Sequence, residues 1–227
     1  MSRPYAGTSA ATGDAPPLRL LEGPLDRRAA PGPASEAAVL VVDIQRGFAD
    51  PELLPWVPPE SIGEIDAAIR SANRLVAAAR GAGVPVVWVR LVQHRESPWH
   101  ASDWFRGYEG DEHGPCVAGT GSVDWFGVAP GDGELVVDKH RYNGFLDTPL
   151  ESMLREMGVT WFVACGLSTE CCVESTVRGG FELGFRAVVA ADACAAWPPE
   201  LHTGALRSMA ANYALVADVD AIVATIT

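Results

Sequence analysis

The segment 161–185 restricts the fold of this chain more than any other stretch of the sequence. It begins with the apolar run 161–165, which is typical of a strand that is covered on both faces. Gly166 interrupts this run, and Thr169 is well placed to cap a helix with its hydroxyl group. From Val173 onward, apolar and small residues recur at helical spacing. A buried strand, a tight turn and a helix in this order indicate one unit of an α/β sheet.

The turn of this segment brings a cysteine to the start of the predicted helix. Cys172 follows the carboxyl end of the strand, where unpaired N–H groups and the helix dipole favour an anion. We expect this setting to lower the pKa of the thiol and to make it a better nucleophile. One alternative is that Cys172 is a small core residue. In another, Cys171 resolves an oxidised Cys172, although adjacent cysteines form strained disulfides.

The rest of the chain continues the alternation of strands and helices. Five further apolar segments predict strands, at 38–43, 84–91, 134–138, 186–191 and 214–217. Capping boxes at 61–64 and 148–151 predict the starts of two helices that end at glycines, and 199–212 predicts another. Six strands separated mostly by helices predict an open parallel sheet with right-handed crossovers.

Two segments do not fit this alternation. Residues 1–36 are rich in Ala, Pro, Gly and Arg, and they predict an N-terminal arm that is flexible or packs on a neighbouring subunit. Residues 37–227 are then a single domain. Within this domain, residues 92–130 form a long connection rich in aromatic residues, which predicts a lid or a binding loop.

Charge and cysteine usage narrow the class of protein. A formal net charge of −12 argues against nucleic acid and anionic membrane surfaces as partners, because both attract basic patches. The five cysteines lack the spacing of a metal site, and free thiols are typical of a reducing compartment. The sequence shows neither a leader nor an apolar run of membrane-spanning length, so we expect a cytoplasmic protein.

Three separated motifs resemble those of the isochorismatase-like cysteine hydrolases. They are Val-Val-Asp-Ile-Gln with Asp43, Val-Asp-Lys-His-Arg-Tyr-Asn-Gly-Phe with Lys139, and Gly-Leu-Ser-Thr-Glu-Cys-Cys-Val-Glu-Ser-Thr with Cys172. The family includes nicotinamidases, N-carbamoylsarcosine amidohydrolases and ureidoacrylate amidohydrolases, and the resemblance extends from about Val39 to the C-terminus. It implies a Rossmann-like open six-stranded parallel sheet with strand order 3-2-1-4-5-6 and helices on both faces. In such sheets, ligands bind beyond the carboxyl ends of the strands.

The resemblance also implies a mechanism. Asp43 would accept the proton of Cys172, whose thiolate would attack the carbonyl carbon of a C–N bond. Lys139 would keep Asp43 ionised and favour the thiolate. The backbone N–H groups of Ser168 and Cys172 would form an oxyanion hole, next to a Leu167–Ser168 peptide bond that is cis in related proteins. Without the resemblance, Asp43 also fits a turn residue and Lys139 a solvated loop charge.

Strand ends and loops supply the candidate substrate contacts. If the chain stays extended after Asp43, Gln45 points to the same side as Asp43. Basic side chains there fit a substrate carboxylate or, alternatively, surface ion pairs, and the aromatic side chains fit a pocket wall or the core. The candidates are Gln45, Phe48, Arg90, His94, Arg141, Tyr142, Phe145 and Trp197. Further candidates for the pocket are Asn143, Trp99 and Trp104.

We expect neither a metal nor a cofactor. Nicotinamidases carry Asp-x-His and a further His after the second strand, but this chain has no Asp two residues before His94. A metal site made by His94, His100 and Asp103 is the alternative. The departure from the nicotinamidase motif argues against a nicotinamide substrate. The run Cys-Val-Glu-Ser-Thr-Val-Arg is similar to that of ureidoacrylate-type enzymes and favours ureides or linear amides.

The sequence therefore predicts a cysteine amidohydrolase that acts on a small amide, ureide or N-carbamoyl compound through a thioester. Because subunits in this family commonly associate, we expect a homo-oligomer, either a dimer or a tetramer. One alternative is a vinyl-ether hydrolase of the isochorismatase type. True isochorismatases resemble this chain at Asp43 and Lys139 but lack the nucleophilic cysteine, so Cys172 argues against this alternative. The other alternative is a non-catalytic binding or scaffold module on the same fold.

Overall fold

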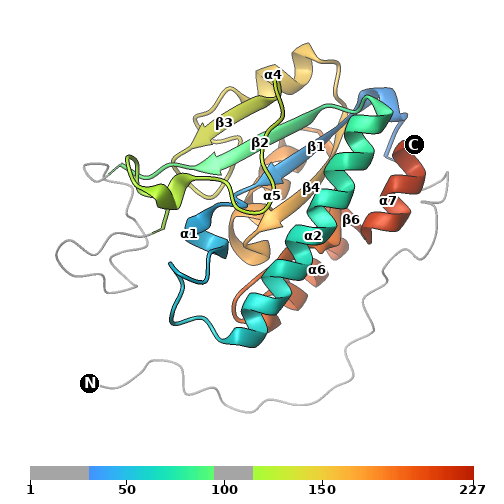
Figure 1. Cartoon of the computed structure of the whole chain (residues 1–227). Helices are drawn as coiled ribbons and strands as arrows, with labels where there is room; N and C mark the ends of the chain where they lie inside the picture. Colours follow the sequence, from blue (N-terminus) through green and yellow to red (C-terminus); the bar gives the residue numbers. More distant parts are fainter. Residues whose placement is uncertain (1–30, 95–114) are drawn as a thin grey trace, which may run out of the picture.

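The computed structural model describes residues 31–94 and 115–227 of the chain. One sheet of six parallel strands organises these residues, with the order β3-β2-β1-β4-β5-β6 (Figure 1). This order confirms the predicted open α/β sheet. The strands are β1 (Ala37–Val42), β2 (Val86–Leu91), β3 (Leu135–Lys139), β4 (Trp161–Leu167), β5 (Arg186–Ala195) and β6 (Ala214–Ala217).

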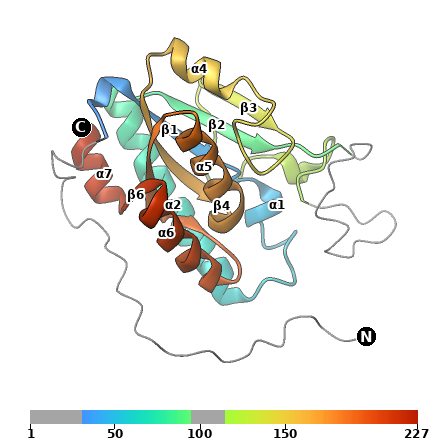
Figure 2. The same ribbon diagram turned by 180° about the vertical axis from the view of Figure 1, so that it is seen from behind.

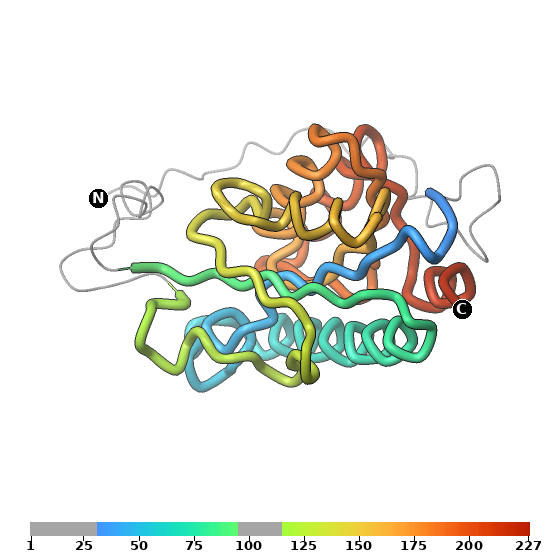
Figure 3. The backbone as a smooth tube through the Cα atoms, turned by 90° about the horizontal axis from the view of Figure 1, so that it is seen from above, coloured from blue at the N-terminus to red at the C-terminus, as the bar shows by residue number. Residues whose placement is uncertain are grey.

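Helices cover both faces of the sheet. Figures 1 and 3 show α2 and α7 on one face, and Figure 2 shows α4, α5 and α6 on the other. The described helices are α1 (Arg46–Ala49), α2 (Pro59–Ala82), α4 (Leu150–Glu156), α5 (Glu174–Glu182), α6 (Pro199–Asn212) and α7 (Val219–Ile226). None of them is long and apolar enough to cross a membrane. The helices that follow the neighbouring strands β1 and β4 lie on opposite faces of the sheet. Ligands bind beyond the carboxyl ends of the strands at such a point.

The two predicted capping boxes do not form. Helix α2 begins at Pro59, so Ser61 lies inside the first turn and its side chain is buried. Proline is favoured at the first helical position because its missing N–H would have no partner there. Helix α4 begins at Leu150, whose N–H donates to Thr148 Oγ1 at 3.3 Å, while Glu151 pairs with Arg155 instead of closing a box.

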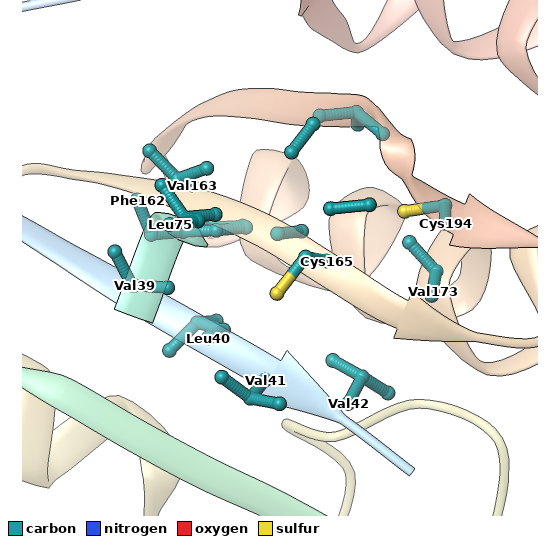
Figure 4. Packing of buried hydrophobic residues seen from close by; sticks show 14 of the residues in the cluster. Val39, Leu40, Val41, Val42, Leu75, Phe162, Val163, Cys165, Val173 and Cys194 are labelled. Atoms are coloured by element: carbon teal, nitrogen blue, oxygen red, sulfur yellow. The ribbon is translucent and has the colours of Figure 1, made fainter. Parts of the chain in front are cut away.

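The central strands carry the core. Every residue of β1 and β4 is buried, as expected for parallel strands that are covered on both faces. Figure 4 shows part of this core, in which side chains of β1 and β4 pack near Leu75 of α2 and Val173 beyond β4. These buried central strands fix the positions of the loops that follow their carboxyl ends.

Gly166 does not end β4, in contrast to the prediction. The strand continues through Gly166 to Leu167, with a register shift against β5 between Ala164 and Gly166. Gly166 has a φ of +131°, and a Cβ atom there would lie 1.9 Å from the carbonyl oxygen of Val42. Only glycine permits this approach of β1 and β4, directly before the turn that carries Cys172.

Part of the predicted N-terminal arm contacts this chain's own sheet. Trp161 Nε1 donates to the carbonyl oxygen of Pro33 at 2.9 Å, and Thr160 Oγ1 donates to Glu36 Oε2 at 2.6 Å. Residues 1–30 lie outside the described residues, as do Trp99, His100, Asp103 and Trp104. The predictions that concern those residues stay predictions.

Candidate active site

Three ionisable side chains, each at or after the end of a different strand, meet at the carboxyl edge of the sheet. Asp43 follows β1, Lys139 ends β3, and Cys172 lies in the turn after β4. Lys139 Nζ is 2.7 Å from Asp43 Oδ2, and it donates hydrogen bonds to Cys172 Sγ at 3.2 Å and to the Arg141 carbonyl oxygen at 3.0 Å. All three side chains are buried. These contacts use the three N–H donors of the ammonium group, so Lys139 is held as a fixed cation.

The backbone of Asp43 turns its carboxylate toward this cluster. Asp43 has a φ of +50°, a conformation that aspartate adopts more readily than most residues. Its N–H donates to the carbonyl oxygen of Val89 at 2.8 Å, which continues the β1–β2 pairing up to the bend. Lys139 starts one strand further away, because β2 lies between β3 and β1. Its long side chain is therefore needed to reach Asp43.

The segment after β4 is a wide turn, and Thr169 does not cap it. Residues Thr169–Val173 form a single π-helical turn before α5, in which the carbonyl oxygen of Ser168 accepts from Cys171 N and Val173 N, both at 3.2 Å. Such turns occur frequently at functional sites. The Thr169 hydroxyl is instead 2.8 Å from His202 Nδ1. The Leu167–Ser168 peptide bond is cis, as the family resemblance implies.

Burial governs the electrostatics of the ion pair. It raises the pKa of Asp43 above its ordinary value of 3.8, although the charge of Lys139 and hydrogen bonding with Cys172 act in the opposite direction. Burial alone would lower the pKa of Lys139, but the attraction of Asp43 and Cys172 outweighs it and raises that pKa. Lys139 therefore stays charged, while Asp43 binds a proton more readily than an exposed aspartate.

The pKa of Cys172 is raised, which corrects the expectation that the helix terminus lowers it. Hydrogen bonding with Cys171, burial and the nearby charge of Asp43 all raise this pKa, and Lys139 only partly offsets them. The thiol therefore holds its proton more strongly than an ordinary cysteine does. A nucleophilic Cys172 must pass its proton to a base, and the Asp43 carboxylate is the neighbouring group that can accept it.

The side chains of Gln45 and Arg90 are engaged by partners within the protein. The Gln45 side chain is fully buried; its amide donates to the carbonyl oxygens of Leu91 and Val123, and it accepts from the Leu91 N–H. The bend at Asp43 breaks the extended geometry on which the prediction for Gln45 rested. Arg90 forms a bidentate ion pair with Asp138: Nε donates to Oδ1 at 2.6 Å and Nη2 donates to Oδ2 at 3.1 Å. Since side chains alternate along a strand, Asp138 and Lys139 face opposite sides of the sheet.

The loop after β3 keeps several candidates near Lys139. The backbone of Arg141 binds Lys139 directly, and its guanidinium lies 3.5 Å from Asp147 while remaining partly exposed. The Tyr142 side chain is exposed. On the neighbouring loop, the exposed His94 ring lies 5.2 Å from the ring of His140. The loop after β3 therefore carries one basic and one aromatic side chain that are at least partly exposed, directly after the residue that binds Asp43.

The aromatic candidates have different environments. Phe145 is buried in the hydrophobic core, and its ring packs 5.7 Å from Phe185 and 6.0 Å from Phe162. Phe48 is partly buried against the core. Trp197 lies just beyond β5 and is 41% exposed. Asn143 accepts a hydrogen bond from the Phe145 N–H and packs against Gly179.

Two residues of the site environment were not predicted. Thr176 is fully buried on α5; its hydroxyl accepts from Gly144 N at 2.9 Å and donates to the Tyr142 carbonyl oxygen at 3.4 Å, which attaches the Lys139 loop to the cysteine helix. His202 of α6 contacts the turn through Thr169. Helical spacing marks Thr176 as buried, but no local sequence signal identifies the partner of either residue.

Metal ligands are not gathered in the described part of the chain. Among residues 31–94 and 115–227, no three His, Cys, Asp or Glu side chains form a group that could hold a metal ion. His100 and Asp103 lie outside this part, so the absence of a metal stays a prediction. The five cysteines are all described, and all are free thiols.

The chain is similar to known proteins over most of its length. The family model of the isochorismatase domain matches residues 37–221. The ureidoacrylate amidohydrolase RutB of Methylobacterium radiotolerans is 34% identical over 197 residues, which cover 81% of this chain and 76% of that protein. RutB of Azorhizobium caulinodans is 35% identical over 179 residues, or 73% of this chain and 78% of that protein.

Solved structures show the same fold. A cysteine hydrolase from Pseudomonas syringae pv. phaseolicola superposes with a TM-score of 0.76 at 24% identity, covering 91% of this chain and 98% of that one. The N-carbamoylsarcosine amidase from Thermoplasma acidophilum superposes with a TM-score of 0.66 at 26% identity, covering 82% and 97% of the two chains.

Proposed function

Starting from the fact that this chain belongs to the isochorismatase family, we propose that it is a cysteine-dependent amidohydrolase with Cys172 as the nucleophile. Its reaction class is the hydrolysis of carbon–nitrogen bonds other than peptide bonds, the class of its ureidoacrylate amidohydrolase relatives. One observation carries the cysteine mechanism. Lys139 Nζ contacts both the Asp43 carboxylate, at 2.7 Å, and the Cys172 thiol, at 3.2 Å, in a buried site.

The first half of the reaction forms a thioester. Asp43 takes the thiol proton while Cys172 Sγ bonds to the carbonyl carbon of the substrate. The negative charge that develops on the carbonyl oxygen is stabilised by the backbone N–H groups of Ser168 and Cys172. When the C–N bond breaks, Asp43 returns the proton to the nitrogen. Ammonia or an amine leaves, and the acyl group stays on the sulfur.

The second half of the reaction regenerates the enzyme. Asp43, again ionised, removes a proton from a water molecule, and the resulting hydroxide attacks the thioester carbon. The carbon–sulfur bond breaks, the acid product leaves, and the thiolate recovers the proton from Asp43. Lys139 stays charged throughout, because its raised pKa keeps the proton on Nζ. Its role is to stabilise negative charge on Asp43 and Cys172 in turn.

The substrate class is a small amide, ureide or N-carbamoyl compound. The partly exposed Arg141 guanidinium supports a substrate that also carries a carboxylate, which arginine binds through two parallel hydrogen bonds. Tyr142 and His94 are proposed as further substrate contacts because both are exposed, Tyr142 on the loop that follows β3 and His94 on the loop that follows β2. We also propose a cytoplasmic homo-oligomer that needs no metal or cofactor and binds neither nucleic acid nor membranes.

A vinyl-ether hydrolase is the weaker candidate. That reaction needs no thiol nucleophile, whereas here the Cys172 thiol shares the Lys139 ammonium with Asp43. A non-catalytic module is also disfavoured, because burying an ion pair is costly and gives a binding protein no evident benefit.

A substrate panel tests the proposal. Ammonia and amine release should be measured from primary amides, N-carbamoyl compounds and ureides, with the wild type, Cys172→Ser and Cys171→Ser. We expect release by the wild type and Cys171→Ser and none by Cys172→Ser, because only Cys172 contacts Lys139. Release that survives in Cys172→Ser would reject the cysteine mechanism, and the absence of release by the wild type from every compound would reject the substrate class.

A further inference from the structure

A hydrogen bond from α6 holds the turn that carries the nucleophile. Thr169 Oγ1 lies 2.8 Å from Nδ1 of His202, and Thr169 is fully buried, whereas the His202 ring is half-buried. The contact joins two segments that are separated by the whole of β5. A buried hydroxyl group that loses its partner costs free energy, so the turn depends on α6 for the satisfaction of Thr169.

The position of Thr169 within the turn gives this bond its importance. Thr169 directly follows Ser168 and precedes Cys172 by three residues, so it lies between the two backbone N–H groups of the proposed oxyanion hole. The turn is wider than an α-helical turn. Inside it, the Ser168 carbonyl oxygen accepts from Cys171 N and Val173 N, and Ser168 Oγ donates to Glu170 Oε1 at 2.7 Å. Side-chain support is therefore an important part of what fixes its shape.

We propose that His202 is a positioning residue, which acts through Thr169 to hold the 168–173 turn so that Cys172 and the oxyanion-hole N–H groups face the substrate carbonyl. This inference rests on the proposed amidohydrolase function. It assigns to His202 no contact with the substrate and no proton transfer. A shift of the turn by a fraction of an ångström would misplace both the attacking Cys172 Sγ and the oxyanion-hole N–H groups. Such a misplacement lowers turnover without weakening substrate binding.

Matched substitutions at the two residues test the proposal. Thr169→Val keeps the shape of the side chain and removes the hydroxyl, whereas Thr169→Ser keeps the hydroxyl. At His202, Asn places an amide near the position of Nδ1, whereas Gln places its amide near Nε2. Thr203→Val makes the same chemical change as Thr169→Val on an exposed residue of α6 next to His202, so it serves as the control.

We expect Thr169→Val and His202→Gln each to lower kcat about tenfold with KM changed less than about twofold. Thr169→Ser, His202→Asn and Thr203→Val should stay within about threefold of wild-type kcat. The double variant Thr169→Val/His202→Gln should be no slower than the slower single variant, because both changes remove one interaction. Independent, multiplying losses would overturn the proposal. So would a rise in KM confined to His202→Gln, which would indicate a substrate contact.

A second readout separates this inference from the proposed function. If the wild type hydrolyses no substrate, the proposed function fails, and the positioning role is judged by alkylation of Cys172 with iodoacetamide in a Cys171→Ser background. Thr169→Val and His202→Gln should then slow alkylation at Cys172 by similar factors, and His202→Asn should restore the rate. Equal rates in all variants, each confirmed to be folded by its melting temperature, would overturn the positioning role.

Discussion

Lys139 Nζ lies 2.7 Å from Asp43 Oδ2, and neither side chain is exposed to solvent. The pair is assembled from β3 and the end of β1, with β2 between them. Two charges in such a place are costly to desolvate, and their mutual attraction repays the cost only while both partners are present. The pair therefore makes folding and chemistry depend on the same two residues.

The coupling of the pair can be measured as stability. Lys139→Met leaves a buried carboxylate without its counter-charge, and we expect it to lower the free energy of unfolding by about 3–5 kcal/mol. Asp43→Asn/Lys139→Met removes both charges and should recover most of that loss. Urea unfolding of Lys139→Met, Asp43→Asn and the double variant gives the coupling energy. Additive losses would show that the two residues do not stabilise each other.

The pH dependence of activity should follow Asp43. Its carboxylate must be ionised to accept the thiol proton, and its pKa is raised above 3.8 mainly by burial. We therefore expect kcat/KM to fall as the pH decreases through this raised pKa, so that the acid limb lies above pH 3.8. The pKa of Lys139 is raised from 10.5, so this residue produces no alkaline limb below that pH. An acid limb at or below the ordinary aspartate pKa would contradict the role of Asp43 as the base.

Gly166 gives a test of how the fold positions the turn. Gly166→Ala would place a Cβ atom 1.9 Å from the Val42 carbonyl oxygen at a φ of +131°. We expect a loss of more than about 4 kcal/mol in the free energy of unfolding, which is exceptional for one methyl group. Gly184→Ala is the control, because Gly184 has a φ of +87° with nothing within 4 Å of the added atom. It should cost only about 1 kcal/mol.

Thr176 should affect substrate binding through the loop that follows Lys139. Thr176→Val removes the acceptor for Gly144 N and the donor to the Tyr142 carbonyl oxygen. We expect a loss of about 1–3 kcal/mol in stability, because the Gly144 N–H is left without its partner. KM for the best substrate should rise, because Arg141 lies on the loosened loop. Thr176→Ser should restore both values. An unchanged KM in Thr176→Val would argue against this loop as a substrate contact.

Local patterns in the sequence predicted the architecture well. The strand at 214–217 and the helix at 199–212 agree with β6 and α6 at both ends. Apolar runs and helical spacing are short-range signals, so they can be recognised without coordinates. The strand order 3-2-1-4-5-6 came from the family motifs and is confirmed. Among the described helices, α1 and α7 were not predicted; α1 is a single short turn.

Several of the failed predictions share a physical cause. The prediction for Gln45 assumed an extended chain, but Asp43 has a positive φ. The Gln45 side chain instead forms hydrogen bonds with the backbone of Leu91. The expected lower pKa of Cys172 considered the helix end alone, whereas burial and Asp43 act more strongly. The contact between Thr169 and His202 depends on how α6 packs, which no local pattern specifies. Local patterns thus did not reveal these interactions between distant segments, whereas the family motifs did indicate that Asp43, Lys139 and Cys172 meet.

The thioester on Cys172 is the most direct test of the proposed chemistry. The best substrate of the panel should be mixed with wild-type enzyme, quenched in acid during turnover and analysed by intact-protein and peptide mass spectrometry, beside Cys172→Ser. We predict an added mass equal to the acyl group, located on Cys172 and absent from the variant. A turning-over enzyme that never carries this mass on Cys172, or a Cys172→Ser variant that still releases product, would contradict the account.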